Sequence, residues 1–473
     1  MELIDYIVLV LYFCTLLGIA VYANKKQKTT EDYYVGGRGV GTLPLAALWM
    51  SSWVGGAAIM GTAEKSYQIG LSSLWYPLSM FSGFIFFALL FAGRIKRLGD
   101  RHQHITYPDL IEQRYDTKAR LVSTVTTILA YVGYTASQLL SAAHIITSIT
   151  GISLGYSFLV ATTVTVAYTS FGGFFAVEKT DRFQTLLVVI GVSAVAVPLT
   201  WHSLGDISRL STELPVDFFQ FGSWGWGAIF AMFISMVLTF FTSMDSYTRC
   251  YAAKSVKSAR NGTLLAALIV LCISVSICFL GMSAKLIIPP GTDGASTLIR
   301  LIMHVFPAGV KGLMLVAILS AIMSTADTCI LCASANLTRD VYQRFINPNA
   351  PQKKVMRLSI ASSVFVGVIG ALVGWYSKSI MDLLIMTFTI NSAGLFLPTV
   401  GVFFWKRATP SAALWSMSVS LVTVIGWYFA KGMFPEFSIF AIDPVWPGLL
   451  ASALIFIPLS LTTPCLQEAK QNA

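Results

Sequence analysis

The sequence LMLVAILSAIMSTADTCILCASANL, from Leu313 to Leu337, decides the class of fold. It is long enough to cross a bilayer, which takes about 20 apolar residues. Asp327 lies near its middle, where a carboxylate costs roughly 2.5–3.5 kcal/mol and needs a partner. Small and hydroxyl side chains share one helix face, spaced i, i+3, i+4 and i+7: Ala321, Ser324, Thr325 and Thr328. Because oxygen ligands without sulfur suit a hard cation, this pattern indicates an ion-coupling helix of a membrane transporter.

The composition agrees with a protein that lies mostly within a bilayer. Of the 473 residues, 55% are hydrophobic and 11% charged, and the mean hydropathy is +0.71. A soluble domain carries about 25% charged residues. The net charge of +10 comes from short loops between apolar runs, which is typical of a positive-inside bias rather than of nucleic-acid binding. We therefore predict an all-α polytopic membrane protein that is not an enzyme and has no nucleic-acid partner.

Thirteen apolar runs are candidate spans. All but seven of the 32 Lys and Arg residues fall on one side of them, which predicts an outer N-terminus and a cytoplasmic C-terminus in a bacterial-type inner membrane. The seven on the other side are Lys65, Arg209, Lys285, Arg300, Lys311, Lys378 and Lys431. The runs are 3–23, 42–61, 71–93, 121–150, 154–173, 183–203, 226–246, 262–284, 311–335, 357–376, 383–404, 412–430 and 444–463.

Two of these spans are interrupted. The second contains SSWVGG (Ser51 to Gly56), and the seventh ends in FFTSMDS (Phe240 to Ser246). Paired glycines loosen a helix and free backbone carbonyls. The two breaks lie five helices apart, which is typical of an inverted-repeat transporter. We predict one transmembrane domain over 1–473, with helices 2–6 (about 42–203) repeated as helices 7–11 (about 226–404) and helices 1, 12 and 13 peripheral. Asp245 is interpreted as a helix cap at the cytoplasmic interface.

Several motifs together resemble one known family. They are VGGRGVG (Val35 to Gly41), SSWVGG followed by GTAEKSY (Gly61 to Tyr67), SFGGFFAVEKTDRFQ (Ser170 to Gln184) and AILSAIMSTADTCILCASANLTRDVYQ (Ala317 to Gln343). The chain resembles the sodium:solute symporter family, nearest to its proline and choline branches. The resemblance implies a leucine-transporter-like 5+5 inverted repeat, and it implies Na⁺ as the coupling ion.

The resemblance also implies where sodium binds. The primary site would use backbone carbonyls at the helix 2 break and on helix 9, together with two hydroxyls: Ser51, Val54, Ala321, Ser324 and Thr325. In sialic-acid-type members a second ion binds one step further in, which here implies Asp181, Ser324, Asp327 and Thr328. Lys179 stands where the family more often has Trp, so the resemblance leaves open whether the chain has one sodium site or two.

The same family places its solute beside the first sodium. The matching positions come from the two breaks and from helices 3 and 4: Trp53, Gly55, Trp75, Tyr76, Tyr134, Gln138, Phe241 and Ser243. Trp53 matches the aromatic cage that choline-type members use for an ammonium group, whereas Ser243 replaces the cage Trp of that branch. No Lys or Arg lies within the core of a predicted span, which favours a zwitterionic or cationic amine such as proline, betaine or choline over a multiply charged anion.

The sequence thus predicts a sodium-coupled symporter that imports a small polar solute by alternating access. Its expected partners are the solute, sodium and the lipid bilayer, and no obligatory protein partner is evident. The alternatives are a symporter of a sugar, a monocarboxylate or sialic acid, and a proton-coupled or sensor-type relative. In the proton-coupled case Asp327 would titrate instead of holding sodium. Packing, rather than solute binding, is the alternative role for three of the aromatic residues: Trp53, Tyr76 and Tyr134.

Overall fold

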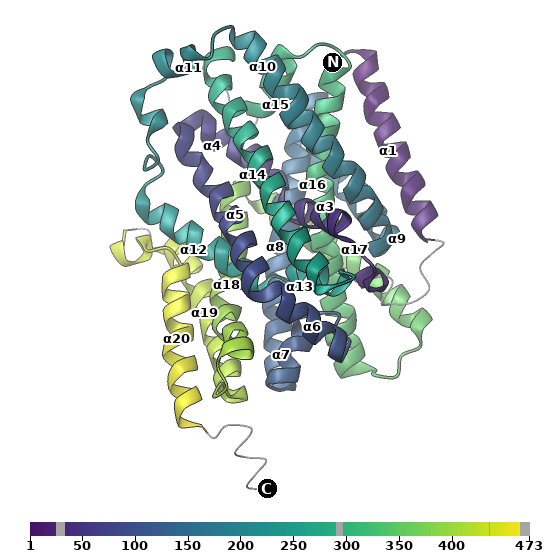
Figure 1. The fold of residues 1–473 in the computed structure, drawn as a ribbon, viewed down its shortest axis with the longest axis vertical. Helices are drawn as coiled ribbons and strands as arrows, with labels where there is room; N and C mark the ends of the chain where they lie inside the picture. Colours follow the sequence, from purple (N-terminus) through teal and green to yellow (C-terminus); the bar gives the residue numbers. More distant parts are fainter. Residues whose placement is uncertain (25–33, 290–296, 378, 435, 464–473) are drawn as a thin grey trace.

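The helices form one elongated bundle, in which α1 follows one edge and α20 the opposite edge (Figure 1). The computed structural model describes residues 1–24, 34–289, 297–377, 379–434 and 436–463. The N-terminus lies at one end of the bundle and the C-terminus at the other. The predicted all-helical fold is confirmed for the described residues.

The first half of the chain runs from α1 to the helical segment α10. Short π-helical stretches join several of its helices end to end without a loop. The helices are α1 (Leu3–Asn24), α3 (Thr42–Trp53), α4 (Thr62–Ile69), α5 (Trp75–Phe87), α6 (Gly93–His102), α7 (Tyr107–Arg114), α8 (Thr117–Thr150), α9 (Leu154–Val188) and α10 (Val197–Leu204).

The second half follows a connecting segment that includes the short helix α11 (Ser208–Glu213). The π-helical stretch η8 (Asn336–Ile346) extends α16 towards the end of the bundle that holds the C-terminus. The remaining helices are α12 (Trp226–Thr242), α13 (Met244–Ala252), α14 (Val256–Ile287), α15 (Thr297–Val305), α16 (Val310–Ala335), α17 (Gln352–Tyr376), α18 (Ile380–Phe404), α19 (Pro410–Met433) and α20 (Val445–Thr462).

Each predicted span coincides with a helix or with part of a broken helix. By length and hydropathy, 8 helices of the described chain can cross a membrane, or 9 if the bent pair α12–α13 is one span. The sequence-based count of thirteen is larger because it also includes α1, the apolar run Leu154–Ala167, the broken α3 and the Ser- and Thr-rich α8. Helix α3 is short because it breaks after Trp53, and α8 is rich in Ser and Thr. Helix α1, with 22 residues, and α9, with 35, are long enough to cross a bilayer.

Both predicted breaks are confirmed. Helix α3 stops at Trp53, and Val54 leaves the helical conformation with φ −94° and ψ 74°. Helix α12 stops at Thr242, and Ser243 is extended with φ −66° and ψ 129°, so α13 departs at 43°. The inverted symmetry of the two halves stays a prediction.

Helix α16 is the centre of the bundle. Every residue from Met314 to Ala335 is buried, and the helix packs against α1, α3, α8, α9 and α17. Asp5 of α1 accepts hydrogen bonds from the backbone N–H groups of Gly309 and Gly312, both at 2.8 Å. A carboxylate stabilises these otherwise unpaired donors at a helix start, so α1 fixes one end of α16.

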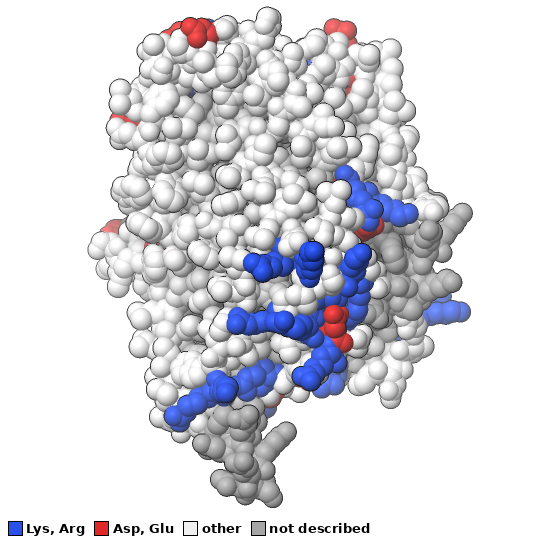
Figure 2. Space-filling view, viewed as in Figure 1, with Lys and Arg blue, Asp and Glu red and all other residues white. Residues whose placement is uncertain are grey.

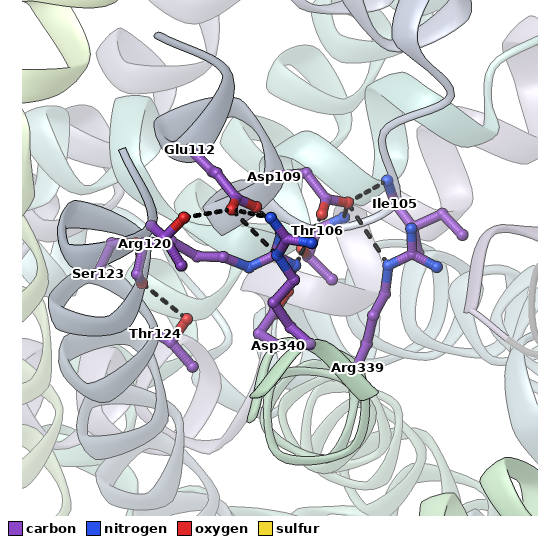
Figure 3. Close-up of polar contacts among 11 residues, drawn as sticks. Ile105, Thr106, Asp109, Glu112, Arg120, Ser123, Thr124, Arg339 and Asp340 are labelled. Atoms are coloured by element: carbon purple, nitrogen blue, oxygen red, sulfur yellow. Dashed lines mark hydrogen bonds and ion pairs between the residues drawn. The ribbon is translucent and has the colours of Figure 1, made fainter. Parts of the chain in front are cut away.

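An ion-pair network fixes the other end (Figure 3). Arg120 at the start of α8 pairs with Asp109 (2.8 Å) and Glu112 of α7 and with Asp340 of η8. Thr106 donates to Asp340 at 2.9 Å. Burial raises the pKa of Asp109, but the nearby Arg339 and Arg120 outweigh this effect and lower that pKa to about 2. The Asp109 carboxylate therefore stays charged near neutral pH.

Candidate ion and solute site

The break in α3 meets the polar face of α16. The Thr325 hydroxyl donates to the Ser51 carbonyl at 2.7 Å, and the Ser324 hydroxyl lies 3.4 Å from the same oxygen. Both hydroxyls also bond to the Ala321 carbonyl of their own helix, at 3.1 and 3.0 Å. Four of the five residues predicted for the primary sodium site therefore share one hydrogen-bonded cluster, and Val54 lies at the break beside it.

Glycine is required at the break because side chains from α8 and α16 approach its backbone closely. A Cβ on Gly55 would lie 2.8 Å from the Thr325 hydroxyl oxygen and 2.3 Å from Gln138 Oε1. A Cβ on Gly56 would lie 2.0 Å from the Ser141 hydroxyl oxygen. The Gly56 N–H instead donates to Gln138 Oε1 at 2.8 Å. Gln138, predicted to contact solute, thus holds α8 against the broken helix.

The donor set of this cluster fits a sodium ion. It consists of backbone carbonyl and hydroxyl oxygens without sulfur or imidazole, which is the chemistry that hard cations prefer. Ser51, Ser324 and Thr325 are each at most 1% exposed. An ion bound here would therefore be largely stripped of water.

Three of the residues predicted for the second sodium site each have a different hydrogen-bond partner. Asp181 Oδ2 accepts a hydrogen bond from the Ser51 hydroxyl. Its other oxygen, Oδ1, has no hydrogen-bond partner among the described residues. Asp327 is hydrogen-bonded to Thr169 of α9. The Thr328 hydroxyl accepts from Arg249 at 2.7 Å. Asp181 therefore adjoins the primary cluster directly, and the second site as a whole stays a prediction.

A buried arginine corrects the expectation that no cation lies in the membrane core. Arg249 of α13 is 3% exposed. Its guanidinium donates to the Ser52 hydroxyl at 2.7 Å and to the Leu48 carbonyl at 3.3 Å, as well as to Thr328. From the sequence, Arg249 was expected in a loop because the predicted span ends at Ser246, whereas the chain continues inside the bundle as α13 after the break.

The interpretation of Asp245 as an interfacial cap was wrong. Asp245 is 2% exposed and begins α13 within the bundle. Its carboxylate accepts a hydrogen bond from the Tyr131 hydroxyl, and its backbone N–H donates to that hydroxyl oxygen at 2.9 Å. Asp245 therefore connects α8 and α13 next to the aromatic residues described below.

Aromatic rings from α8, α12 and α18 surround Trp53. The indole stacks on Phe240 with 3.7 Å between centroids and 10° between planes, and on Phe388 at 5.8 Å. Tyr134 meets Phe388 edge-on at 5.7 Å, and its hydroxyl donates to the Ser52 carbonyl at 3.2 Å. Phe240 and Phe388 were not among the residues predicted from the sequence, and the prediction there was the neighbouring Phe241. One residue along a helix turns the side chain by about 100°.

The remaining predicted solute residues are dispersed. Trp75 donates to the Phe221 carbonyl at 2.9 Å and contacts Trp226, the first residue of α12, edge-on. Phe241 packs on Phe91 with 4.6 Å between centroids. Ser243 lies at the α12 break, 3.4 Å from Asn391 Nδ2, and Tyr76 is buried. Among the predicted solute residues, Trp53, Gly55, Tyr134, Gln138 and Ser243 remain close to the two breaks.

Two broken helices facing a buried polar stripe define the class of protein as a secondary transporter. A model of the sodium:solute symporter family matches residues 33–420, and the chain belongs to this family. The chain is 28% identical to a sodium/proline symporter of Haemophilus influenzae, and the match covers 95% of this chain and 93% of that protein. It is 27% identical to the osmoregulated proline transporter OpuE of Bacillus subtilis (96% and 94%) and 26% identical to a sodium/pantothenate symporter of Escherichia coli (95% and 94%).

Solved structures show the same fold. A Na⁺-coupled sialic acid symporter in a substrate-bound outward-open state matches with a TM-score of 0.83 at 19% identity, over 98% of this chain and 99% of the other. Mhp1, a nucleobase-cation-symport-1 family transporter, matches at 0.62 and 14% identity, over 93% and 97%. The chain is therefore a sodium-coupled symporter of a small organic solute, and the predicted family, fold and coupling ion are confirmed.

Proposed function

We propose that the chain imports a small zwitterionic amine of the proline type together with sodium. The single observation that carries this proposal is the contact between Ser51 at the α3 break and Thr325 of α16, at 2.7 Å and next to stacked aromatic rings. It puts oxygen donors suited to a hard cation next to a cluster of buried aromatic rings. Several relatives of similar length are named as proline transporters.

The proposed sodium ligands are the carbonyls of Ser51, Val54 and Ala321 and the hydroxyls of Ser324 and Thr325. The hydroxyl protons now point at carbonyl oxygens, so an arriving cation would turn them away and use the lone pairs. Asp181 would guide or hold a further ion through its unpartnered oxygen. Asp327 and Thr328 are the remaining residues of that proposed second site.

The proposed solute pocket lies against Trp53. An ammonium group over an aromatic face gains up to about 2 kcal/mol when desolvated, and the stacked rings suit an apolar ring on the same solute. Sodium and the buried Arg249 offer counter-charge for a carboxylate. Tyr134, Gln138 and Ser243 supply polar groups at the edge of the pocket. Choline is less favoured because it carries no carboxylate and Ser243 does not complete an aromatic cage.

Coupling follows if both ligands favour one conformation. Sodium would join α3 to α16, and the solute would join the α3 break to α12 and α18 through the rings of Trp53, Phe240 and Phe388. Each ligand would then raise the affinity for the other by the same factor.

We also propose that the N-terminus lies outside and the C-terminus in the cytoplasm of a bacterial inner membrane. The end of the bundle that carries the C-terminus also carries most Lys and Arg side chains on the face shown in Figure 2. This distribution is the one expected of cytoplasmic loops. The lipid bilayer, sodium and the solute are the proposed partners.

Uptake by proteoliposomes tests the proposal. An inward sodium gradient should drive accumulation of radiolabelled proline, and an equal potassium gradient should not. Betaine, choline, pantothenate and sialic acid serve as unlabelled competitors. Undiminished accumulation in potassium, with dependence on a pH gradient, would instead support the proton-coupled alternative, in which Asp181 or Asp327 titrates.

A further inference from the structure

Three arginines of α6 surround a hollow next to the end of α18. Arg94, Arg97 and Arg101 are spaced i, i+3 and i+7, which puts them on one helix face. All three side chains are exposed. They line the hollow together with Leu98, Val402 and Phe403. We call this feature the basic hollow.

The charge of the basic hollow is not neutralised by neighbouring carboxylates. The acidic residue of α6, Asp100, is 2.7 Å from Lys96 Nζ. In the part of the chain that the structure describes, no ion pair joins the three arginines to an Asp or Glu. A Cβ on Gly93 would lie 3.3 Å from Val256, so the start of α14, with its exposed Lys257 and Arg260, adds further positive charge nearby.

One arginine is already held in place. The Arg94 guanidinium carbon lies 4.5 Å from the centroid of the Phe404 ring, and Nη1 donates to the Leu90 carbonyl at 2.8 Å. These contacts fix a planar donor group at the rim of the hollow. Figure 2 shows Lys and Arg side chains gathered over the lower part of this face, where Figure 1 places α6.

The hollow lies where the helix leaves the apolar part of the bilayer. One turn before Arg94, Leu89 is 53% and Leu90 46% exposed, and Phe404 across the hollow is 49% exposed. Exposed apolar side chains at that level face acyl chains. The arginines that follow them therefore lie at the depth of the lipid headgroups, where a basic pocket attracts anionic lipid.

We propose that the basic hollow binds the phosphodiester headgroup of an anionic phospholipid, whose acyl chains lie along Leu89, Leu90 and Phe404. Arginine guanidinium groups match phosphate oxygens with paired hydrogen bonds. The adjoining apolar side chains favour a lipid over a soluble anion or an acidic protein segment. This site is independent of the proposed sodium and solute sites.

Native mass spectrometry of the purified full-length chain tests the proposal. Dioleoylphosphatidylglycerol and dioleoylphosphatidylcholine are added in equal amounts to delipidated protein in detergent. Wild type should retain phosphatidylglycerol in preference. Arg97→Gln with Arg101→Gln should weaken that retention roughly tenfold. The matched control, Lys118→Gln with Lys353→Gln, removes two exposed charges outside the basic hollow. It should retain phosphatidylglycerol as the wild type does.

Other outcomes overturn the proposal. An equal loss in the control pair would mean that bulk surface charge attracts the lipid. No preference in wild type, or full displacement by inorganic phosphate, would exclude a built headgroup site. Should the Gln pair not fold, Arg97→Lys with Arg101→Lys keeps the charge but not the planar fork; it should show weakened retention, and unchanged retention would contradict a guanidinium-specific site.

Discussion

At the scale of single residues, the account depends on two hydroxyls facing one carbonyl. Ser324 and Thr325 both point at the Ser51 oxygen exposed by the α3 break. Replacing a ligand of a charged group costs about 1.5–3 kcal/mol. We expect Ser324→Ala with Thr325→Ala to raise the sodium concentration for half-maximal uptake at least tenfold. Uptake kinetics at varied sodium concentration measure this change.

The control for that prediction is Ser334→Ala. Ser334 lies on the same helix, and its hydroxyl bonds to the Leu331 carbonyl at 3.0 Å. This variant should keep normal sodium dependence. If the Ser324 and Thr325 double variant is also unchanged, sodium binds elsewhere and the ligand assignment is wrong.

A second residue-scale prediction concerns Trp53. The indole lies at the α3 break and stacks on Phe240 at 3.7 Å, and we propose that it forms one wall of the solute pocket. Loss of a desolvated ring contact costs about 2 kcal/mol, so Trp53→Ala should weaken proline affinity roughly 30-fold. Trp53→Phe should recover part of it, and Trp415→Ala, on a 56% exposed side chain of α19, should have no effect. Solute binding at saturating sodium measures all three variants, and a normal Trp53→Ala affinity would place the pocket elsewhere.

The sequence was sufficient for residues whose partner is set by helical spacing. Ser324 and Thr325 lie at i+3 and i+4 from Ala321, which puts both next to it on the helix surface, and the glycines at 55 and 56 mark the opposing break. It was not sufficient for Arg249, Phe240 or Phe388. Their roles depend on which way α12 and α13 turn after Ser243 and on which ring of α18 reaches Trp53, and these are tertiary contacts between residues far apart in the chain.

At the scale of elements, α16 is held at both ends by charged groups. Asp340 on its extension is fully buried and paired with Arg120. Removing one partner of a buried pair costs about 3–5 kcal/mol because the other charge remains unpaired. We expect Arg120→Gln to lower the melting temperature of the purified protein by several degrees.

The matched control is Arg209→Gln. Arg209 and Glu213 form an ion pair whose side chains are 41% and 45% exposed, and an exposed pair contributes about 0–1 kcal/mol. Its melting temperature should stay within about a degree of wild type. Equal melting temperatures for both variants would show that the network in Figure 3 does not stabilise α16.

Arg249 gives a prediction about how three elements move together. It joins α13 to Ser52 of α3 and to Thr328 of α16, each at 2.7 Å. Since only a guanidinium spans both acceptors, Arg249→Lys should lower the maximal rate of uptake about tenfold while changing sodium affinity little. Initial rates at saturating sodium and proline measure this. A normal rate for Arg249→Lys would show that a point charge is enough.

At the scale of the whole molecule, hydropathy and charge asymmetry predicted the helical bundle and its spans. Two of the predicted spans do not stand alone as apolar helices: α3 ends at the break after Trp53, and α8 is rich in Ser and Thr. The inverted repeat stays a prediction, because neither residue spacing nor composition encodes a symmetry between distant parts of the chain.

The most direct test of the central claim is reciprocity of binding. Radioactive sodium and labelled proline are each bound to the purified chain in the presence and absence of the other. The account predicts that proline raises sodium affinity by the same factor as sodium raises proline affinity, on the order of 5- to 150-fold. Proline binding that is unchanged by sodium, or a sodium affinity that is unchanged by proline, would contradict it.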